Sequence, residues 1–138
     1  MTEDYIDHLL ADIRYSEVFA DMKVVRANSF NELQIPCEKP VVSLAYEISD
    51  GWEYLIGADD TVMGQPKLTV TVITDERSGS AYCEQTARCV CMELLRLDKR
   101  GDYTSVAVER CRYDRNTFAY RSVITFGLRE CINSRKSG

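Results

Sequence analysis

Residues 68–95 read LTVTVITDERSGSAYCEQTARCVCMELL, and two different periodicities follow each other within this stretch. From Leu68 to Thr74, apolar side chains alternate with threonines, which predicts a strand with one buried face. After Gly79 the spacing of apolar residues changes to that of a helix. The stretch therefore predicts a strand that leads directly into a helix packed on it.

The predicted helix begins with Ser80 as its N-cap and ends near Gly101, which can terminate it. Its apolar stripe consists of Cys83, Ala87, Val90, Cys91, Leu94 and Leu95. Four charged residues lie mostly off this stripe: Glu84, Arg88, Glu93 and Arg96. This pattern is typical of a helix with one face on a protein core.

Other elements follow on both sides of this stretch. Residues 3–20 predict a first helix, with an apolar stripe of Ile6, Leu9, Leu10 and Ile13. Residues 41–48 and 52–56 predict strands that Asp50-Gly51 joins as a hairpin, because Asp-Gly favours a tight turn. Residues 104–113 and 118–128 predict a closing hairpin, and the last strand carries Phe118, Tyr120, Ile124, Phe126 and Leu128 on one face.

The predicted order is helix, three strands, helix, two strands. We expect a single α+β domain over 1–138, with two helices on one mainly antiparallel sheet and a polar tail from about residue 132. Hydrophobic residues make up 45% and charged residues 28% of the chain, which is a globular balance. The acidic N-terminus predicts no secretory signal, and no apolar run is long enough to span a membrane.

The charge is divided unevenly along the chain. Residues 1–60 hold 13 acidic and 4 basic side chains, whereas residues 61–138 hold 9 acidic and 13 basic ones. The two halves either neutralise each other within one fold or present opposite surfaces to neighbouring copies. The net charge of −5 disfavours a sequence-specific nucleic-acid binder.

The six cysteines suggest a metal site or disulfides. No C-x-x-C motif occurs and His8 is the only histidine, so we expect no metal site and no cofactor. A disulfide framework needs an oxidising compartment. We interpret Cys37, Cys83, Cys89, Cys91, Cys111 and Cys131 as reduced, small apolar residues.

No catalytic constellation is evident, so we expect a protein that is not an enzyme. His8 lies on the polar side of the first helix, without the partners that nucleophilic catalysis requires. Asp59 and Asp60, with Glu53, are an alternative cation site, but their spacing matches no calcium loop.

Two sets of side chains are candidates for binding another protein. Arg110 and Arg112 are expected on one strand face, and Arg121 on the polar face of the partner strand. The first hairpin carries Trp52 and Tyr54, with Asp59 and Asp60 after it. Surface arginines that form salt links and aromatic residues that pack in the core are the alternatives.

The order and patterning of these elements resemble the tail-terminator, or tail-completion, proteins of long-tailed phages and phage-tail-like bacteriocins. The resemblance is carried by the opening helix and by four further stretches. These are 41-VVSLAYEISDGWEYLIG-57, LTVTVIT (68–74), 80-SAYCEQTARCVCMELL-95 and 118-FAYRSVITFGL-128. It implies a hexameric ring that caps the tail tube, and the sheath if present, and that joins the head or neck. It also implies a virion component made in the bacterial cytoplasm.

The resemblance implies copies of the same chain, the tail tube protein and the sheath protein as partners, and no membrane. A small ligand-binding or regulatory α+β domain is the alternative. Oligomeric state separates the two hypotheses, because a ring assembles on itself or on a tube.

Overall fold

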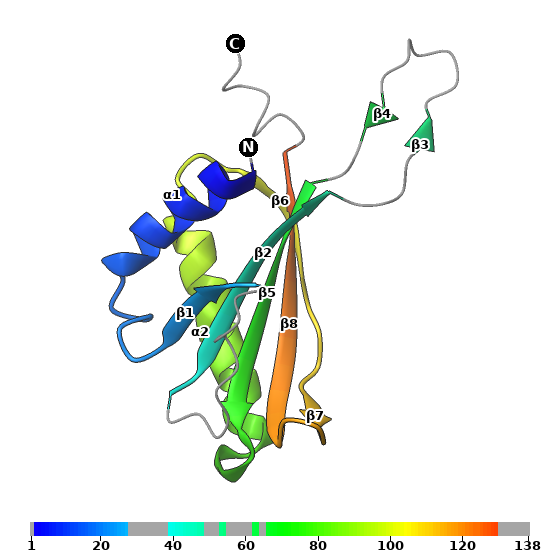
Figure 1. The fold of residues 1–138 in the computed structure, drawn as a ribbon. Coiled ribbons are helices and arrows are strands. Elements are labelled where there is room, and N and C mark those ends of the chain that lie inside the picture. The colour runs from blue at the N-terminus through cyan, green and yellow to red at the C-terminus, as the bar shows by residue number, and fades with distance from the viewer. Residues whose placement is uncertain (1, 28–38, 49–52, 55–61, 64–65, 130–138) are drawn as a thin grey trace.

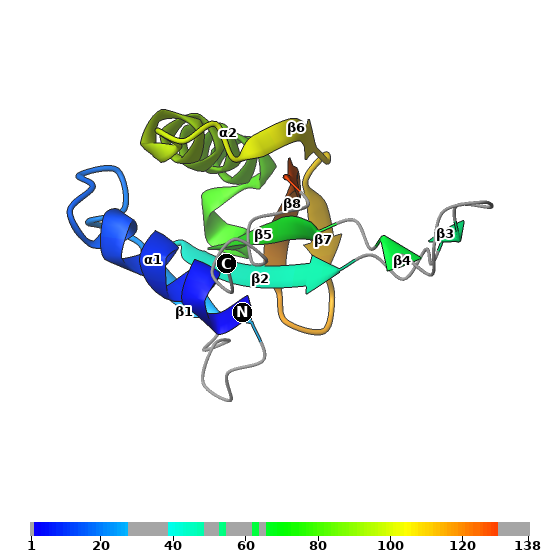
Figure 2. The ribbon, with the colours of Figure 1, turned by 90° about the horizontal axis from the view of Figure 1, so that it is seen from above.

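The computed structural model of the protein describes residues 2–27, 39–48, 53–54, 62–63 and 66–129. Two helices, α1 (Thr2–Arg14) and α2 (Ser80–Leu97), pack on one face of a mixed, six-stranded sheet (Figure 1). Seen from above, the sheet curves around the two helices (Figure 2). The predicted α+β class is confirmed, as is the predicted order of a helix, a group of strands, a second helix and a second group of strands.

The main sheet has the strand order β1-β2-β5-β8-β6, and β7 also pairs with β8. β1 is parallel to β2, whereas the other pairings are antiparallel. The bounds of these strands are Lys23–Arg26 for β1, Val41–Ile48 for β2, Pro66–Asp75 for β5, Tyr103–Val108 for β6, Arg112–Asp114 for β7 and Ala119–Leu128 for β8.

Three short elements complete the described structure. β3 (Glu53–Tyr54) and β4 (Val62–Met63) pair with each other in a separate two-stranded sheet. A 3-10 turn, η1 (Glu76–Ser78), joins β5 to α2. β3 and β4 lie beyond the end of the main sheet at which β2 ends and β5 begins (Figure 1).

The core lies between the central strands and the helices. Val70 lies opposite Ile124 and Leu68 opposite Phe126, and all four side chains are fully buried. Residues directly opposite each other in an antiparallel pair share a face, so these pairs form the floor on which the helices pack. The alternation in LTVTVIT therefore has the predicted cause.

The predicted stripe of α2 is confirmed for Cys83, Ala87, Val90 and Leu94, which are all fully buried. The N-cap was predicted one residue too late, because Gly79 occupies this position with a φ of 87°. Such a positive φ favours glycine over a residue with a Cβ. Within the described ranges, neither helix is long and apolar enough to cross a membrane.

The first helix is shorter than predicted, since α1 ends at Arg14. The amide of Ser16 then donates to the carbonyl oxygen of Ile13 at 2.9 Å, which tightens the chain into a turn. The following segment contributes Phe19 to the core and continues into β1, an edge strand that the sequence analysis missed. β1 has only four residues, too few to establish an alternating pattern.

The first predicted hairpin is wrong in its pairing. β2 pairs with β1 and β5 instead of with a strand over 52–56. Tyr54 belongs to β3 and pairs with Val62 of β4. Asp50-Gly51 lies outside the described residues. The long partner strand β5 offers β2 eight paired positions, which outweigh a local turn preference.

The closing hairpin is also interrupted. The predicted strand over 104–113 divides into β6 and β7, with residues 109–111 between them. Phe118 was predicted to face the core, but it lies in the turn with a φ of 54° and is mostly exposed. The Asp114 carboxylate accepts hydrogen bonds from the Asn116 amide and the Thr117 hydroxyl, which holds this turn.

Candidate interaction surface

The two helices cover only part of the sheet. A helix with its side chains is about 10–12 Å wide, and neighbouring strands lie about 4.8 Å apart, so one helix covers about two strands. α1 packs on β2, whereas α2 packs on β5 and β8. β6 is the next strand beyond β8. Within the described residues, neither helix therefore covers the helix-bearing face of β6.

Two valines of β6 are exposed on this bare face. Val106 lies opposite Phe126, and Val108 lies opposite Ile124. Each valine therefore points to the side of the sheet that carries the core. However, Val106 is 43% and Val108 is 48% exposed, whereas their two partners on β8 are fully buried. In the described structure, the core face thus continues onto the edge strand β6, where the two valines are exposed.

The neighbouring flank of α2 is apolar as well. Met92 is 68% exposed and Leu95 is 39% exposed, and Cys91 next to them is buried. We call Met92, Leu95, Val106 and Val108 the apolar strip. Met92 and Val108 line the same hollow, and exposed apolar groups that gather in one place mark binding surfaces more often than isolated ones do.

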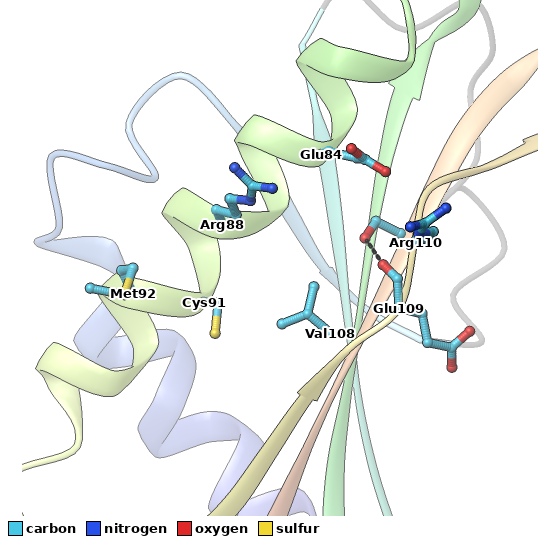
Figure 3. Close-up of a pocket in the computed structure, with 8 residues that line it drawn as sticks. Glu84, Arg88, Cys91, Met92, Val108, Glu109 and Arg110 are labelled. Carbon is cyan, nitrogen blue, oxygen red and sulfur yellow. Dashed lines mark hydrogen bonds between the residues drawn. The ribbon is translucent and has the colours of Figure 1, made fainter.

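A groove of about 590 Å³ lies between α2 and the chain around the end of β6. We call it the α2–β6 groove. Figure 3 shows Cys91 on α2 and Val108 on β6 on opposite sides of it. Its lining residues are Glu84, Arg88, Cys91, Met92, Val108, Glu109, Arg110 and Ser122.

The segment between β6 and β7 is fixed beside this groove by three hydrogen bonds. The Glu109 amide donates to the Val123 carbonyl oxygen at 2.9 Å, and the Ser122 hydroxyl donates to the Glu109 carbonyl oxygen at 3.0 Å (Figure 3). The Cys111 amide donates to the Glu84 carboxylate at 3.3 Å. Arg110 is thereby held at the rim, on the side opposite Arg88.

The outer edge of β6 is open within the described part of the chain, because β8 is its only strand partner there. An open edge presents unpaired backbone N–H and C=O groups, which can pair with a strand from another chain. The open edge lies on the same strand as Val106 and Val108 of the apolar strip. Together they offer both the backbone and the side-chain contacts of an added element.

The predicted arginine stripe is corrected by the structure. Arg110 lies on the segment between β6 and β7, so it shares no strand face with Arg112. Arg112 lies directly opposite Arg121 on the paired strands β7 and β8. Arg121 donates from Nε to the Asp114 carboxylate at 3.1 Å and is only partly exposed. Arg110 and Arg112 therefore remain the more exposed of the three.

The hydrogen bonds at Asp114 have an electrostatic consequence. The Thr117 hydroxyl, the Asn116 amide and the Arg121 guanidinium all favour the ionised carboxylate, so they lower the pKa of Asp114.

The other predicted interface residues, Trp52, Asp59 and Asp60, lie outside the described residues. The side chain of Tyr54 does as well.

The cysteines agree only in part with their predicted role. Cys83, Cys89, Cys91 and Cys111 carry free thiols, and Cys37 and Cys131 lie outside the described residues. Burial raises the pKa of Cys83 and Cys91, and it raises the pKa of Cys111 to about 12. Cys89 is exposed, so it is not a packing residue.

A second hollow, of about 560 Å³, lies between α1 and the end of α2. At its wall the Tyr5 hydroxyl donates to the Tyr103 hydroxyl at 3.3 Å. Burial is the main reason that the pKa of both phenols is raised, to about 12 for Tyr103. His8 also lines this hollow and is exposed, as predicted. These contacts join α1 to the start of β6.

The apolar strip was missed by the sequence analysis. The run Thr104-Ser-Val-Ala-Val108 alternates like a strand with a buried face, and the sequence analysis predicted a strand here without giving its valines a role. The exposure of these valines depends on how far the two helices reach across the five strands. The alternation within a single strand carries no information about that.

In the described part of the chain, no group of three His, Cys, Asp or Glu side chains is placed to hold a metal ion.

Comparison with known proteins adds no relative from which a site could be transferred. No protein-family model matches the chain, and no curated protein matches its sequence.

Proposed function

We propose that this chain is a structural subunit of a phage tail or tail-like particle. Copies of it form a ring that caps the tail tube, and the sheath if present. The ring ends tail polymerisation and joins the tail to the head, neck or collar. Two arguments support this proposal: the resemblance in element order and patterning to tail terminators, and the apolar strip beside an open strand edge.

The open edge and the strip carry the proposal. A protein that acts alone usually covers or charges its edge strands, because an uncovered apolar edge promotes association. Here Val106 and Val108 stand exposed on the edge strand, next to Met92 of α2. A subunit that is permanently in contact with its neighbours has no need of such protection.

The charge distribution supports a head-to-tail contact in the ring. Residues 1–60 are strongly acidic and residues 61–138 are basic. Opposite charges on two different surfaces favour a contact in which one copy offers one surface and its neighbour the other. Such a heterologous contact closes into a ring when its rotation divides a circle.

Light scattering after size-exclusion chromatography, combined with electron microscopy, tests the proposal. The protein is measured over a range of concentrations and salt, alone and with the tail tube protein encoded near its gene. We expect rings, alone or templated on tube ends, and weaker association at high salt, because the Debye length is about 10 Å at 0.1 M.

The volume of the α2–β6 groove favours a second candidate. At about 590 Å³ it lies within the range of small-molecule pockets, so a ligand-binding or regulatory domain is the alternative. A folded protein that neither self-associates nor caps a tube contradicts the ring proposal and favours this second function.

A further inference from the structure

On the helix-bearing face, one strand of the main path, β6, has no helix packed over it in the described structure. Two helices cover about four of the five strands in the order β1-β2-β5-β8-β6. A two-stranded ribbon is about 10 Å wide, because its strands lie about 4.8 Å apart. A ribbon that lies on β6 beside α2 therefore also reaches past the open edge of β6.

The described part of the chain contains a two-stranded ribbon that is separate from the main sheet. β3 and β4 pair with each other, and no strand of the main sheet pairs with them within the described residues. Both views show them projecting away from the helices and from β6 (Figures 1 and 2).

Register places this ribbon and the groove at different levels of the sheet. Val108 is level with Ile124, which is level with Val70. β5 begins four residues before Val70, at Pro66. This separation amounts to about 14 Å along the sheet. A copy therefore directs its ribbon away from its own groove, and the groove is available to a neighbour.

The sequence around the ribbon is complementary to the groove. Between Lys39 and Lys67 the chain has no lysine or arginine and five acidic residues, together with apolar residues that include Trp52, Leu55 and Ile56. The groove combines the exposed Val108 and Met92 with Arg88 and Arg110.

The groove lining also contains two acidic residues, Glu84 and Glu109. The Glu84 carboxylate accepts the Cys111 amide, and the Glu109 carboxylate points away from α2 (Figure 3). Arg88 and Arg110 therefore face an incoming acidic segment from two sides.

We propose that the α2–β6 groove and the adjoining apolar strip bind the acidic, aromatic segment of residues 47–63 from a second copy of this chain. The inference rests on the proposed function and specifies the contact between neighbours in the ring. Because the segment and the groove are different surfaces of the same chain, each copy inserts its segment into one neighbour and receives the segment of another neighbour in its groove.

Photo-crosslinking of the full-length protein tests this contact. Val108 is replaced by p-benzoylphenylalanine in one preparation and Met92 in another, since both positions are exposed. Nitrogen-15-labelled and unlabelled copies are mixed, irradiated and digested. Expected are mixed-isotope crosslinks from both positions to residues 47–63 within the tryptic peptide 27–67. Crosslinks confined to one isotope, crosslinks to other peptides or no crosslinks overturn the proposal.

A charge-reversal pair provides the second arm. Arg88→Glu with Arg110→Glu should weaken self-association and crosslinking at least about tenfold, because like charges then face the acidic segment. Arg115→Glu is the matched control, since Arg115 is exposed but lies outside the groove lining. It should reduce association far less. Equal losses in both variants contradict a specific role of the groove; circular dichroism verifies that each variant folds.

The two proposals fail in different ways. Rings whose crosslinks map elsewhere keep the proposed function and overturn the groove contact. Mixed-isotope crosslinks from the groove in a closed dimer keep the contact and contradict the ring. A monomer without crosslinks at any concentration, alone or on tubes, overturns both.

Discussion

The hydroxyl of Ser16 donates a hydrogen bond to the carboxylate of Glu93 at 2.6 Å, which joins the turn after α1 to the second half of α2. Arg96 donates to the same carboxylate from Nε at 2.8 Å and from Nη2 at 2.5 Å. The Glu93 side chain is only 7% exposed. The charge pattern alone had assigned Glu93 to the polar side of the helix, so its burial against α1 corrects that prediction.

Glu93→Ala should lower the free energy of unfolding by about 1–3 kcal/mol, because the buried Ser16 hydroxyl loses its acceptor. Glu93→Gln keeps the volume and an oxygen that accepts from Ser16, so its loss should be smaller. Urea unfolding followed by circular dichroism measures both variants. Equal stability of Glu93→Ala and the wild type would show that the contact does not stabilise the fold.

The same carboxylate should make stability depend on pH. Hydrogen bonds from Arg96 and then Ser16 lower the pKa of Glu93 from 4.5 to about 2. A carboxylate with a lowered pKa in the folded state stabilises it fully above the unfolded pKa and loses that effect as pH falls. The advantage of the wild type over Glu93→Gln should therefore be constant above about pH 5 and shrink between 4.5 and 2.

Urea midpoints of the wild type and Glu93→Gln, measured in parallel from neutral to acidic pH, check this expectation. Other carboxyl groups titrate in both proteins, so their effect cancels in the difference. A difference that stays constant down to pH 2, or that grows in acid, would contradict the lowered pKa.

The sequence predicted those parts of the fold in which one periodic pattern is buried on one side. α2 and the strands β5 and β8 have such patterns, and their bounds agree closely with the prediction. Pairing was less predictable. Asp50-Gly51 favoured a local hairpin, but β2 pairs with β5, since long-range contacts along eight positions outweigh a turn preference.

The candidate surface was predictable only in its charge. Arg110 was expected at an interface and does line the groove. The apolar strip was not expected, because the residues of β6 follow the same alternation as a buried strand. Whether Val108 is covered depends on the width of α1 and α2 relative to the whole sheet, a tertiary property.

Core packing predicts a large contrast between two neighbouring positions on α2. Leu94→Ala should lower the free energy of unfolding by about 2–5 kcal/mol, because it opens a cavity at a fully buried site. Met92→Ala should change it by about 0.5 kcal/mol or less, because Met92 is exposed in the single copy. Denaturant melts at concentrations where the protein is monomeric provide the comparison; similar losses would contradict the observed register of α2.

The cysteines should differ in their reactivity in the order of their exposure. Cys89 is exposed and should be alkylated first, whereas Cys83 and Cys91 are buried, with raised pKa values, and should react only after unfolding. Mass spectrometry of protein alkylated without reductant, before and after denaturation, identifies each site. Alkylation of Cys83 as fast as that of Cys89 in the folded protein, or a persistent disulfide, would contradict the packing role.

Asp98 should control how β6 begins. Its two carboxylate oxygens accept the backbone amides of Asp102 at 2.9 Å and Tyr103 at 3.0 Å, across a turn in which Gly101 has a φ of 70°. Asp98→Ala removes both acceptors and should cost about 1–3 kcal/mol, whereas Asp98→Asn keeps one acceptor and should cost less. Hydrogen exchange provides the local readout, because the amides of Asp102 and Tyr103 should exchange faster in Asp98→Ala. If β6 positions the groove for a neighbouring copy, Asp98→Ala should also weaken self-association. Unchanged hydrogen exchange at the amides of Asp102 and Tyr103 in this variant would refute the role of Asp98.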